Sequence, residues 1–247
     1  MCAAMLALFL MRTATLARGR RSAVAPRQAA RRTLVSTAAA GKVLHLVRHG
    51  ETEMNTYLRA NDWAAPDFRD PLLWDTRLTE RGQSQASALA RTTSTITPPP
   101  ELIAVSPLTR ALHTADLAFG QTYRNNGTAW VACPLARERN YHASDIGRPA
   151  EELADEDFAA HVDFAEATGN WWGGPRETVQ PLEPDAQFTA RMLELTRWLA
   201  RRDEQSIALV CHWGVLYALT GRQFSNCELA TVRLGSLTTW ASLEIEC

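Results

Sequence analysis

Three short, mostly apolar runs limit the architecture that this chain can adopt. They span residues 43–47, 102–105 and 207–210, and each has the length of a buried strand rather than of a core helix. Amphipathic segments lie between them and predict helices. Strands that alternate with helices form a mostly parallel sheet that is covered on both faces. We therefore predict an α/β fold, a three-layer α/β/α sandwich with a mostly parallel central sheet.

Capping and turn residues set the expected ends of the helices. Thr79 is placed to cap a helix, and Gly120 is expected to end a later one that begins near Pro107. The expected helices cover residues 79–90, 107–119, 151–164 and 185–202, and two late strand-like runs, residues 227–234 and 237–245, are placed at an edge of the sheet.

Polar residues follow each of the three apolar runs. Arg48 and His49 follow the first run, the segment 106–110 follows the second, and His212 follows the third after a single cysteine. Ligands of parallel α/β sheets bind beyond the carboxyl ends of the strands, where these ends lie side by side. The sequence therefore predicts that the three polar clusters open onto one edge of the sheet.

This set of side chains suits a small, doubly charged anion. Arg48 and Arg110 offer planar, permanently charged groups that match phosphate oxygens, and Arg110 lies in the first turn of its predicted helix, where the free amides also favour an anion. Nearby positive charge lowers the pKa of a histidine, and a neutral imidazole can attack phosphorus. A carboxylic acid within residues 137–145 could then protonate the leaving group.

Four motifs resemble one known family. RHGETEMN (48–55), SPLTRALHTA (106–115), LARE (135–138) and VCHWG (210–214) occur in the order seen in the histidine phosphatase superfamily, which has the phosphoglycerate mutase-like fold. The resemblance extends over residues 42–240. FSNCEL (224–229) is also similar to a segment of plant and algal phosphoglycerate mutase-like proteins, which is a narrower match.

The resemblance implies a role for each matched residue. His49 corresponds to the histidine that forms a phosphohistidine, and Glu138 to the acid that protonates the leaving oxygen and then activates water. Asp145 lies close by in the sequence, so the choice between Glu138 and Asp145 as the general acid stays open. The other residues implied to contact phosphate are Arg48, Arg110, His212 and Asn55. The resemblance implies no metal and no cofactor, and His45 and His49 merely share one face of a strand.

The fate of the phosphohistidine divides the family into phosphatases and mutases. Arg139 and Tyr141 stand where cofactor-dependent mutases place substrate contacts, and Trp213 replaces the small residue often found there, so it could narrow the pocket or form an apolar wall. A mutase needs a second basic subsite, whereas Lys42 is the sole lysine. We therefore expect hydrolysis of a small phosphorylated metabolite, for example a sugar phosphate, ahead of mutase activity, with a catalytically silent phosphate-binding regulatory module as a third interpretation.

The first forty residues differ in composition from the rest. They contain seven arginines and no carboxylate, which is typical of an organelle transit peptide; a secretory signal is the alternative. We expect residues 1–40 to be a disordered leader to a plastid, or else to a mitochondrion, and residues 41–247 to form one domain. That domain holds 19 basic and 27 acidic residues, so we expect neither nucleic acid nor a membrane as a partner. The oligomeric state is left open.

Overall fold

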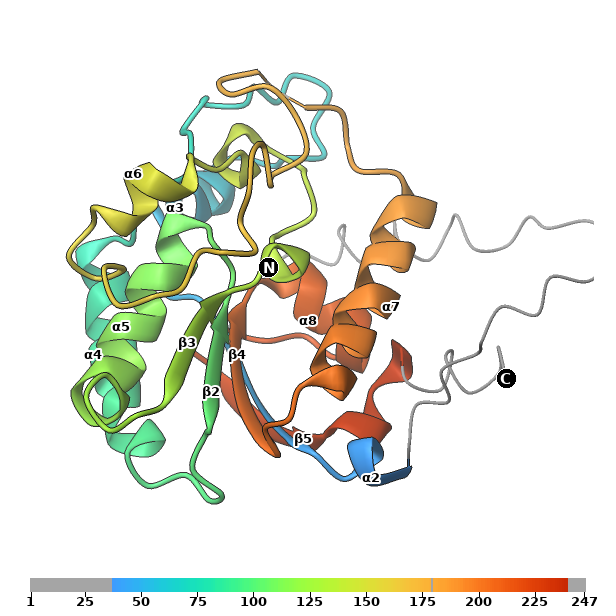
Figure 1. Cartoon of the computed structure of the whole chain (residues 1–247). Helices are drawn as coiled ribbons and strands as arrows, with labels where there is room; N and C mark the ends of the chain where they lie inside the picture. The colour runs from blue at the N-terminus through green and yellow to red at the C-terminus, as the bar shows by residue number, and fades with distance from the viewer. Residues whose placement is uncertain (1–36, 179, 240–247) are drawn as a thin grey trace, which may run out of the picture.

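The computed structural model describes residues 37–178 and 180–239 (Figure 1). Within them, five strands form one sheet in the order β3-β2-β4-β1-β5. β1 pairs in parallel with β4, β4 with β2, and β2 with β3, while β5 runs antiparallel along β1 at the edge. The strands are β1 (Val43–Arg48), β2 (Leu102–Val105), β3 (Ala129–Ala132), β4 (Ser206–Cys211) and β5 (Leu229–Arg233).

Helices cover both faces of this sheet (Figure 1). α4 (Glu80–Thr93) and α5 (Thr109–Tyr123) pack on one face, and α7 (Asp185–Arg201) and α8 (Trp213–Thr220) pack on the other. Alternation along β2 supplies both cores, because Leu102 and Ala104 face α7 and α8 whereas Ile103 and Val105 face α4 and α5. The predicted three-layer α/β/α sandwich is confirmed. Shorter elements are α2 (Thr37–Ala40), α3 (Glu53–Ala60), α6 (Ala150–Ala154), and the 3₁₀ turns η1 (Pro134–Ala136), η2 (Ala143–Asp145) and η3 (Leu234–Ser236).

Local signals explain most of the element boundaries. The Thr79 side chain accepts a hydrogen bond from the amide of Gly82, as expected for the cap of α4. The prediction that Gly120 ends α5 was wrong, since the helix continues to Tyr123. Phe119 and Tyr123 are both buried, and this packing outweighs the weak helix propensity of one glycine.

Three further sequence predictions need correction. The helix expected over residues 151–164 is limited to α6, and β3 was not predicted at all. Residues 237–239 do not form a strand, and the remainder of that expected run lies outside the described residues. α2 belongs to the expected leader yet packs on the domain, with Ala39 in the core; the rest of the leader lies outside the described residues.

The parallel register places the functional motifs side by side. Arg48 at the end of β1 lies level with Cys211 at the end of β4, so the two histidines that follow are neighbours. The amide of His49 donates to the carbonyl of Cys211, and the amide of Ser106 donates to that of Val210. The expected convergence on one sheet edge is therefore present. Among the described helices, none is long and apolar enough to cross a membrane.

Candidate active site

Two histidine rings meet at the carboxyl end of the sheet. The ring centroids of His49 and His212 lie 5.1 Å apart. The Nδ1 atom of His49 lies 2.7 Å from the carbonyl oxygen of Gly50. A carbonyl can only accept, so Nδ1 carries the proton and Nε2 of the neutral ring keeps its lone pair. The local backbone thus sets the tautomer that a nucleophilic imidazole requires.

His212 is held from the neighbouring strand. Its Nε2 atom lies 2.7 Å from the hydroxyl oxygen of Ser106, which follows β2. The Nδ1 atom of His212 is buried and has no hydrogen-bond partner among the described residues. A buried ring nitrogen without a partner is costly unless a ligand completes its hydrogen bonding.

Burial and positive charge keep both rings neutral. Desolvation lowers the pKa of His49 well below its ordinary value, and Arg110 and Arg48 lower it further. His212 follows the same pattern, with desolvation first and then Arg110 and the His49 ring. Both imidazoles are therefore uncharged at physiological pH, as the sequence predicted for at least one of them.

The two arginines are anchored by backbone and carboxylate groups. Arg48 donates a 2.8 Å hydrogen bond to the carbonyl of Phe224. Arg110 donates to Asp145 Oδ1 at 2.8 Å and to the carbonyl of Ser144. Burial lowers the pKa of Arg48 to about 10, so it stays charged at neutral pH. Two fixed guanidinium groups thus flank the histidine pair, a geometry suited to an anion with several oxygens.

Asp145 has both carboxylate oxygens engaged. Its Oδ1 accepts from Arg110, while its Oδ2 accepts from the backbone amides of Tyr141 and His142 at 3.0 and 3.1 Å. This carboxylate joins α5 to the segment 141–145 and orients the guanidinium group. Its contacts suit a residue that positions Arg110 rather than one that delivers a proton.

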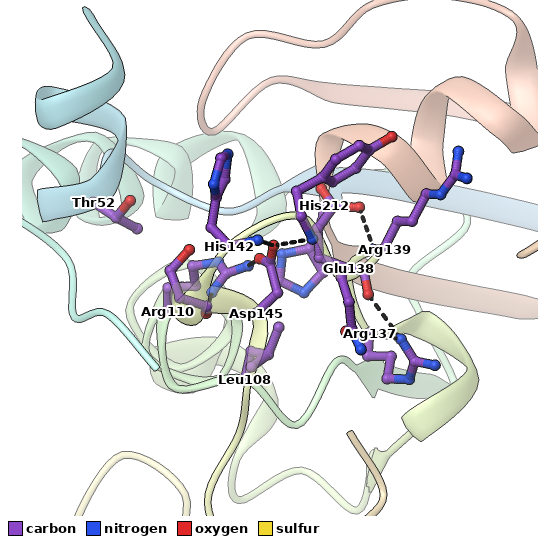
Figure 2. Close-up of polar contacts among 12 residues, drawn as sticks. Thr52, Leu108, Arg110, Arg137, Glu138, Arg139, His142, Asp145 and His212 are labelled. Atoms are coloured by element: carbon purple, nitrogen blue, oxygen red, sulfur yellow. Dashed lines mark hydrogen bonds and ion pairs between the residues drawn. The ribbon is translucent and has the colours of Figure 1, made fainter. Parts of the chain in front are cut away.

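Glu138 differs from Asp145 in that both of its oxygens accept hydrogen bonds from backbone amides, whereas one oxygen of Asp145 accepts from Arg110. Its Oε1 accepts from the amide of Arg139 at 2.9 Å, and its Oε2 accepts from the amide of Gly214 at 3.0 Å. Burial raises the pKa of Glu138, and the negative charge of Asp145 raises it further. A raised pKa keeps part of this carboxyl protonated at higher pH, which is what a general acid needs. In Figure 2, Glu138, Asp145 and Arg110 surround His212, each from a different segment.

One cavity of about 600 Å³ is lined by His49, both arginines and the carboxylates of Glu138 and Asp145, whereas His212 is fully buried beside His49 and is not among the lining residues. Asn55 on α3 also lines it; the Oδ1 atom of Asn55 accepts from the amide of Thr52 and from Asn226 Nδ2. Asn226 Nδ2 lies 3.0 Å from the carbonyl of His49 as well, so it links α3 to the loop that follows β1. The polar residues that line the cavity around His49 include Arg48, Asn55, Arg110, Glu138 and Asn226.

The remaining predicted substrate contacts have different fates. Tyr141 and Trp213 line the cavity, but Arg139 does not. The Arg139 guanidinium donates to the carbonyl of Glu183 and to Asp185 Oδ1, at the start of α7. Figure 2 shows it projecting away from Arg110. The structure therefore does not bring Arg139 to the site, because an acidic helix start binds it elsewhere.

Two glycines allow the loop that follows β1 to pack against the start of α4. A Cβ atom on Gly50 would lie 2.6 Å from the carbonyl oxygen of Gly82, and one on Gly82 would lie 2.0 Å from the carbonyl oxygen of Glu51. The start of α4 thus contacts the backbone that follows His49 directly. Gly50 is required by this close approach of two backbones.

His45 is a core histidine. It is fully buried, its Nδ1 lies 2.9 Å from Thr231 Oγ1, and its Nε2 lies 2.9 Å from the carbonyl of Pro98. Both ring nitrogens are thus satisfied by protein groups. His45 takes no part in the site.

Comparison with known proteins identifies the family. A model of the histidine phosphatase superfamily (branch 1) matches residues 44–246. The chain belongs to this superfamily. This histidine phosphatase homologue is similar to a phosphoglycerate mutase-like protein of Arabidopsis thaliana, with 27% identity over 75% of this chain and 76% of that protein.

Two further proteins that are similar to this chain carry the names of phosphatases. Fructose-2,6-bisphosphatase TIGAR B of Danio rerio is 34% identical over 44% of this chain, and the match spans only 38% of that protein. The crystal structure of the ecdysone phosphate phosphatase of Bombyx mori, in complex with tungstate, superposes with a TM-score of 0.52 at 16% identity, covering 78% of this chain and 89% of that one. The structural likeness shows the phosphoglycerate mutase-like fold.

Sequence reasoning missed several groups of this histidine phosphatase family site. Ser106, Asn226 and Gly214 all lie inside motifs that the sequence analysis quoted, yet their contacts depend on chain segments far apart in sequence. The role of Asp145 in holding Arg110 was missed for the same reason. The motifs marked the right segments, whereas the pairings required the fold.

Proposed function

We propose that the protein hydrolyses a phosphomonoester of a small metabolite through a phosphohistidine on His49. The observation that carries this proposal is the His49 ring itself, which is neutral, bonded at Nδ1 to the Gly50 carbonyl, and set between two anchored arginines. Such an imidazole presents Nε2 as a nucleophile beside a ready-made phosphate pocket.

The first half-reaction transfers the phosphoryl group to the enzyme. Arg48 and Arg110 bind the phosphoryl oxygens while His49 Nε2 attacks phosphorus. The N–P bond forms as the P–O bond to the alcohol breaks, and Glu138 gives its proton to the leaving oxygen. His212, uncharged, completes the pocket from the end of β4.

The second half-reaction restores the enzyme. The Glu138 carboxylate accepts a proton from water, the resulting hydroxide attacks phosphorus, and the N–P bond breaks to release inorganic phosphate. His49 returns to its neutral form and Glu138 is again protonated. The positive charges of Arg48 and Arg110 stabilise the transferred group, so we propose that no metal is needed.

Mutase-type phosphoryl transfer is the second candidate. Tyr141 lines the cavity as it would in such an enzyme, but the Arg139 guanidinium lies over the Tyr141 ring, is bound to Glu183 and Asp185, and does not itself line the cavity. Hydrolysis therefore ranks first. A silent phosphate-binding module ranks last, because nucleophile, arginines and acid are all present in one cavity.

The decisive experiment is an alkaline quench in SDS after incubation with a ³²P-labelled phosphomonoester, in the presence of EDTA. Label should remain on the wild-type protein in an acid-labile, base-stable form, and it should be absent from His49→Ala. Turnover by His49→Ala at the wild-type rate would overturn the mechanism. A panel of phosphorylated metabolites, assayed with and without 2,3-bisphosphoglycerate, separates the two candidates, because a mutase would isomerise 3-phosphoglycerate only when that cofactor is present.

A further inference from the structure

The cavity extends well beyond the phosphate pocket. Its volume of about 600 Å³ lies within the range of sites that bury a whole ligand of drug-like size. The phosphoryl group occupies only the end that contains His49. The remaining space must therefore accommodate the alcohol part of the ester, and the side chains around it define which alcohol fits.

Five apolar or aromatic side chains line this second part. Met54 and Leu58 come from α3, Trp63 from the loop that follows it, Trp213 from α8, and Phe224 from the segment before β5. Trp213 stacks on Tyr217 with ring centroids 5.4 Å apart, so its position is set by packing within α8. Side chains of this kind favour rings and hydrocarbon surface over a hydrated sugar or a carboxylate.

The cations that could bind a second anion are neutralised. Besides the two arginines of the phosphate pocket, Arg59 is the other arginine that lines the described cavity, and it pairs with Glu51 at 2.6 Å while 52% exposed. Arg139 and Arg191 are bound to the segment 183–185 outside the cavity. A bisphosphate or a phosphorylated acid would thus bring a second charge into a site with no counter-charge reserved for it among the described residues.

Polar residues such as His142, Gln223 and Ser225 also line the cavity, and two further lining residues carry a polar atom that lacks a protein partner within the described part of the chain. Thr76 Oγ1 and Trp213 Nε1 are buried and have no hydrogen-bond partner among the described residues. Both residues line the cavity. Buried donors without partners favour a ligand that carries an oxygen for them to bind.

We infer that the substrate is the monophosphate of a largely apolar, ring-containing alcohol that bears one or two further hydroxyl or carbonyl oxygens. This inference rests on the proposed function, since it names the leaving group of that reaction. Trp63 and Leu58 contact the ring system, and Thr76 and Trp213 bind its oxygens.

The test compares esters whose leaving groups have similar basicity. 2-Phenylethyl phosphate and glycerol 3-phosphate both release a primary alcohol, so a difference in kcat/KM between them reports binding of the alcohol. We expect at least a tenfold preference for 2-phenylethyl phosphate, and a still larger one over 3-phosphoglycerate and fructose 2,6-bisphosphate. Equal or better turnover of any of these three polar esters, with label still trapped on His49, would overturn the inference alone. Absence of His49 labelling with every ester would instead overturn the proposed function.

Single substitutions test which side chains bind the alcohol part of the ester. Trp63→Ala should raise KM for 2-phenylethyl phosphate at least fivefold and leave KM for glycerol 3-phosphate within twofold. Leu182→Ala is the matched control, because Leu182 is apolar, exposed and outside the cavity, and it should change neither value. An equal effect of Trp63→Ala on both esters, or no effect on either, contradicts the apolar wall.

The oxygen contacts have their own test. Thr76→Val keeps the shape of the side chain and removes its hydroxyl, and Trp213→Phe keeps an aromatic ring and removes the indole N–H. We expect each variant to lower kcat/KM for 2-(4-hydroxyphenyl)ethyl phosphate more than threefold relative to 2-phenylethyl phosphate. If both variants leave that ratio unchanged, the hydroxyl-binding part of the inference fails.

Discussion

Gly214 and Glu138 are fitted to one another at the start of α8. The Gly214 amide donates a 3.0 Å hydrogen bond to Glu138 Oε2, and a Cβ atom on Gly214 would lie 2.5 Å from Glu138 Oε1. A side chain at this position would displace the carboxyl group. Gly214, two residues after His212, therefore fixes the carboxyl group of Glu138, the proposed general acid.

Gly214→Ala should slow hydrolysis of alkyl phosphates by about 10–100-fold, less than the 10²–10⁴-fold that complete loss of a general acid costs. The reason is displacement of the Glu138 carboxyl rather than its removal. Steady-state kcat is the measurement, and combination with Glu138→Gln is the control. The double variant should be no slower than Glu138→Gln alone, because the two residues act as a unit. Additive losses would contradict this coupling.

Glu138 and Asp145 should respond differently to the leaving group. Glu138→Ala should lower kcat/KM, which reports phosphoryl transfer to His49, by about 10²–10⁴-fold for alkyl phosphates, and should affect kcat/KM for 4-nitrophenyl phosphate little, since 4-nitrophenolate leaves without a proton. Asp145→Asn weakens the hold on Arg110 and should raise KM for both ester types alike. Kinetics with paired alkyl and 4-nitrophenyl esters measure this. Leaving-group dependence in Asp145→Asn, with none in Glu138→Ala, would transfer the acid role to Asp145.

The pH dependence of kcat/KM follows from the shifted pKa values. The lowered pKa of His49 keeps the nucleophile neutral down to pH values well below 6.5, so the acid-side fall should lie there after correction for the substrate's own second pKa near 6. The raised pKa of Glu138 places the alkaline fall for alkyl esters above 4.5. With 4-nitrophenyl phosphate that fall should be absent until Arg48 loses its charge near pH 10. An acid-side pKa at or above 6.5 in the corrected profile would contradict a neutral, desolvated His49.

Much of the fold was predictable because buried parallel strands leave a strong local signal. The runs that form β1, β2 and β4 are apolar except for His45 and the polar residues at the strand ends, and the carboxyl-end rule places Arg48, His49 and His212 together. β3 escaped because its four residues carry little pattern of their own, and its pairing with β2 and with Asp163 is a tertiary event.

The site was harder to predict where contacts between loops determine the direction of a side chain. Arg139 follows Glu138 directly, and the resemblance to cofactor-dependent mutases implied that it contacts the substrate. In the fold, the carbonyl of Glu183 and the carboxylate of Asp185 bind its guanidinium group, so it points away from the cavity. Contacts between segments more than 40 residues apart leave no periodic signature, so the motif alone could not indicate that Glu138 lines the cavity while its neighbour does not.

The contact between α4 and the loop that follows β1 yields a prediction about stability. Gly82→Ala should destabilise the protein by at least about 1–3 kcal/mol, the usual cost of overpacking, because its Cβ would lie 2.0 Å from the carbonyl oxygen of Glu51 and neither backbone can yield easily. Urea unfolding measures the loss, and Ser84→Ala is the control, since Ser84 is exposed on the same helix. That control should stay within about 0.5 kcal/mol of wild type. Folded Gly82→Ala should also lose phosphohistidine formation, because Gly50 and His49 shift with Glu51. Wild-type stability and labelling in Gly82→Ala would show that this close approach of backbones is not needed to hold the nucleophile.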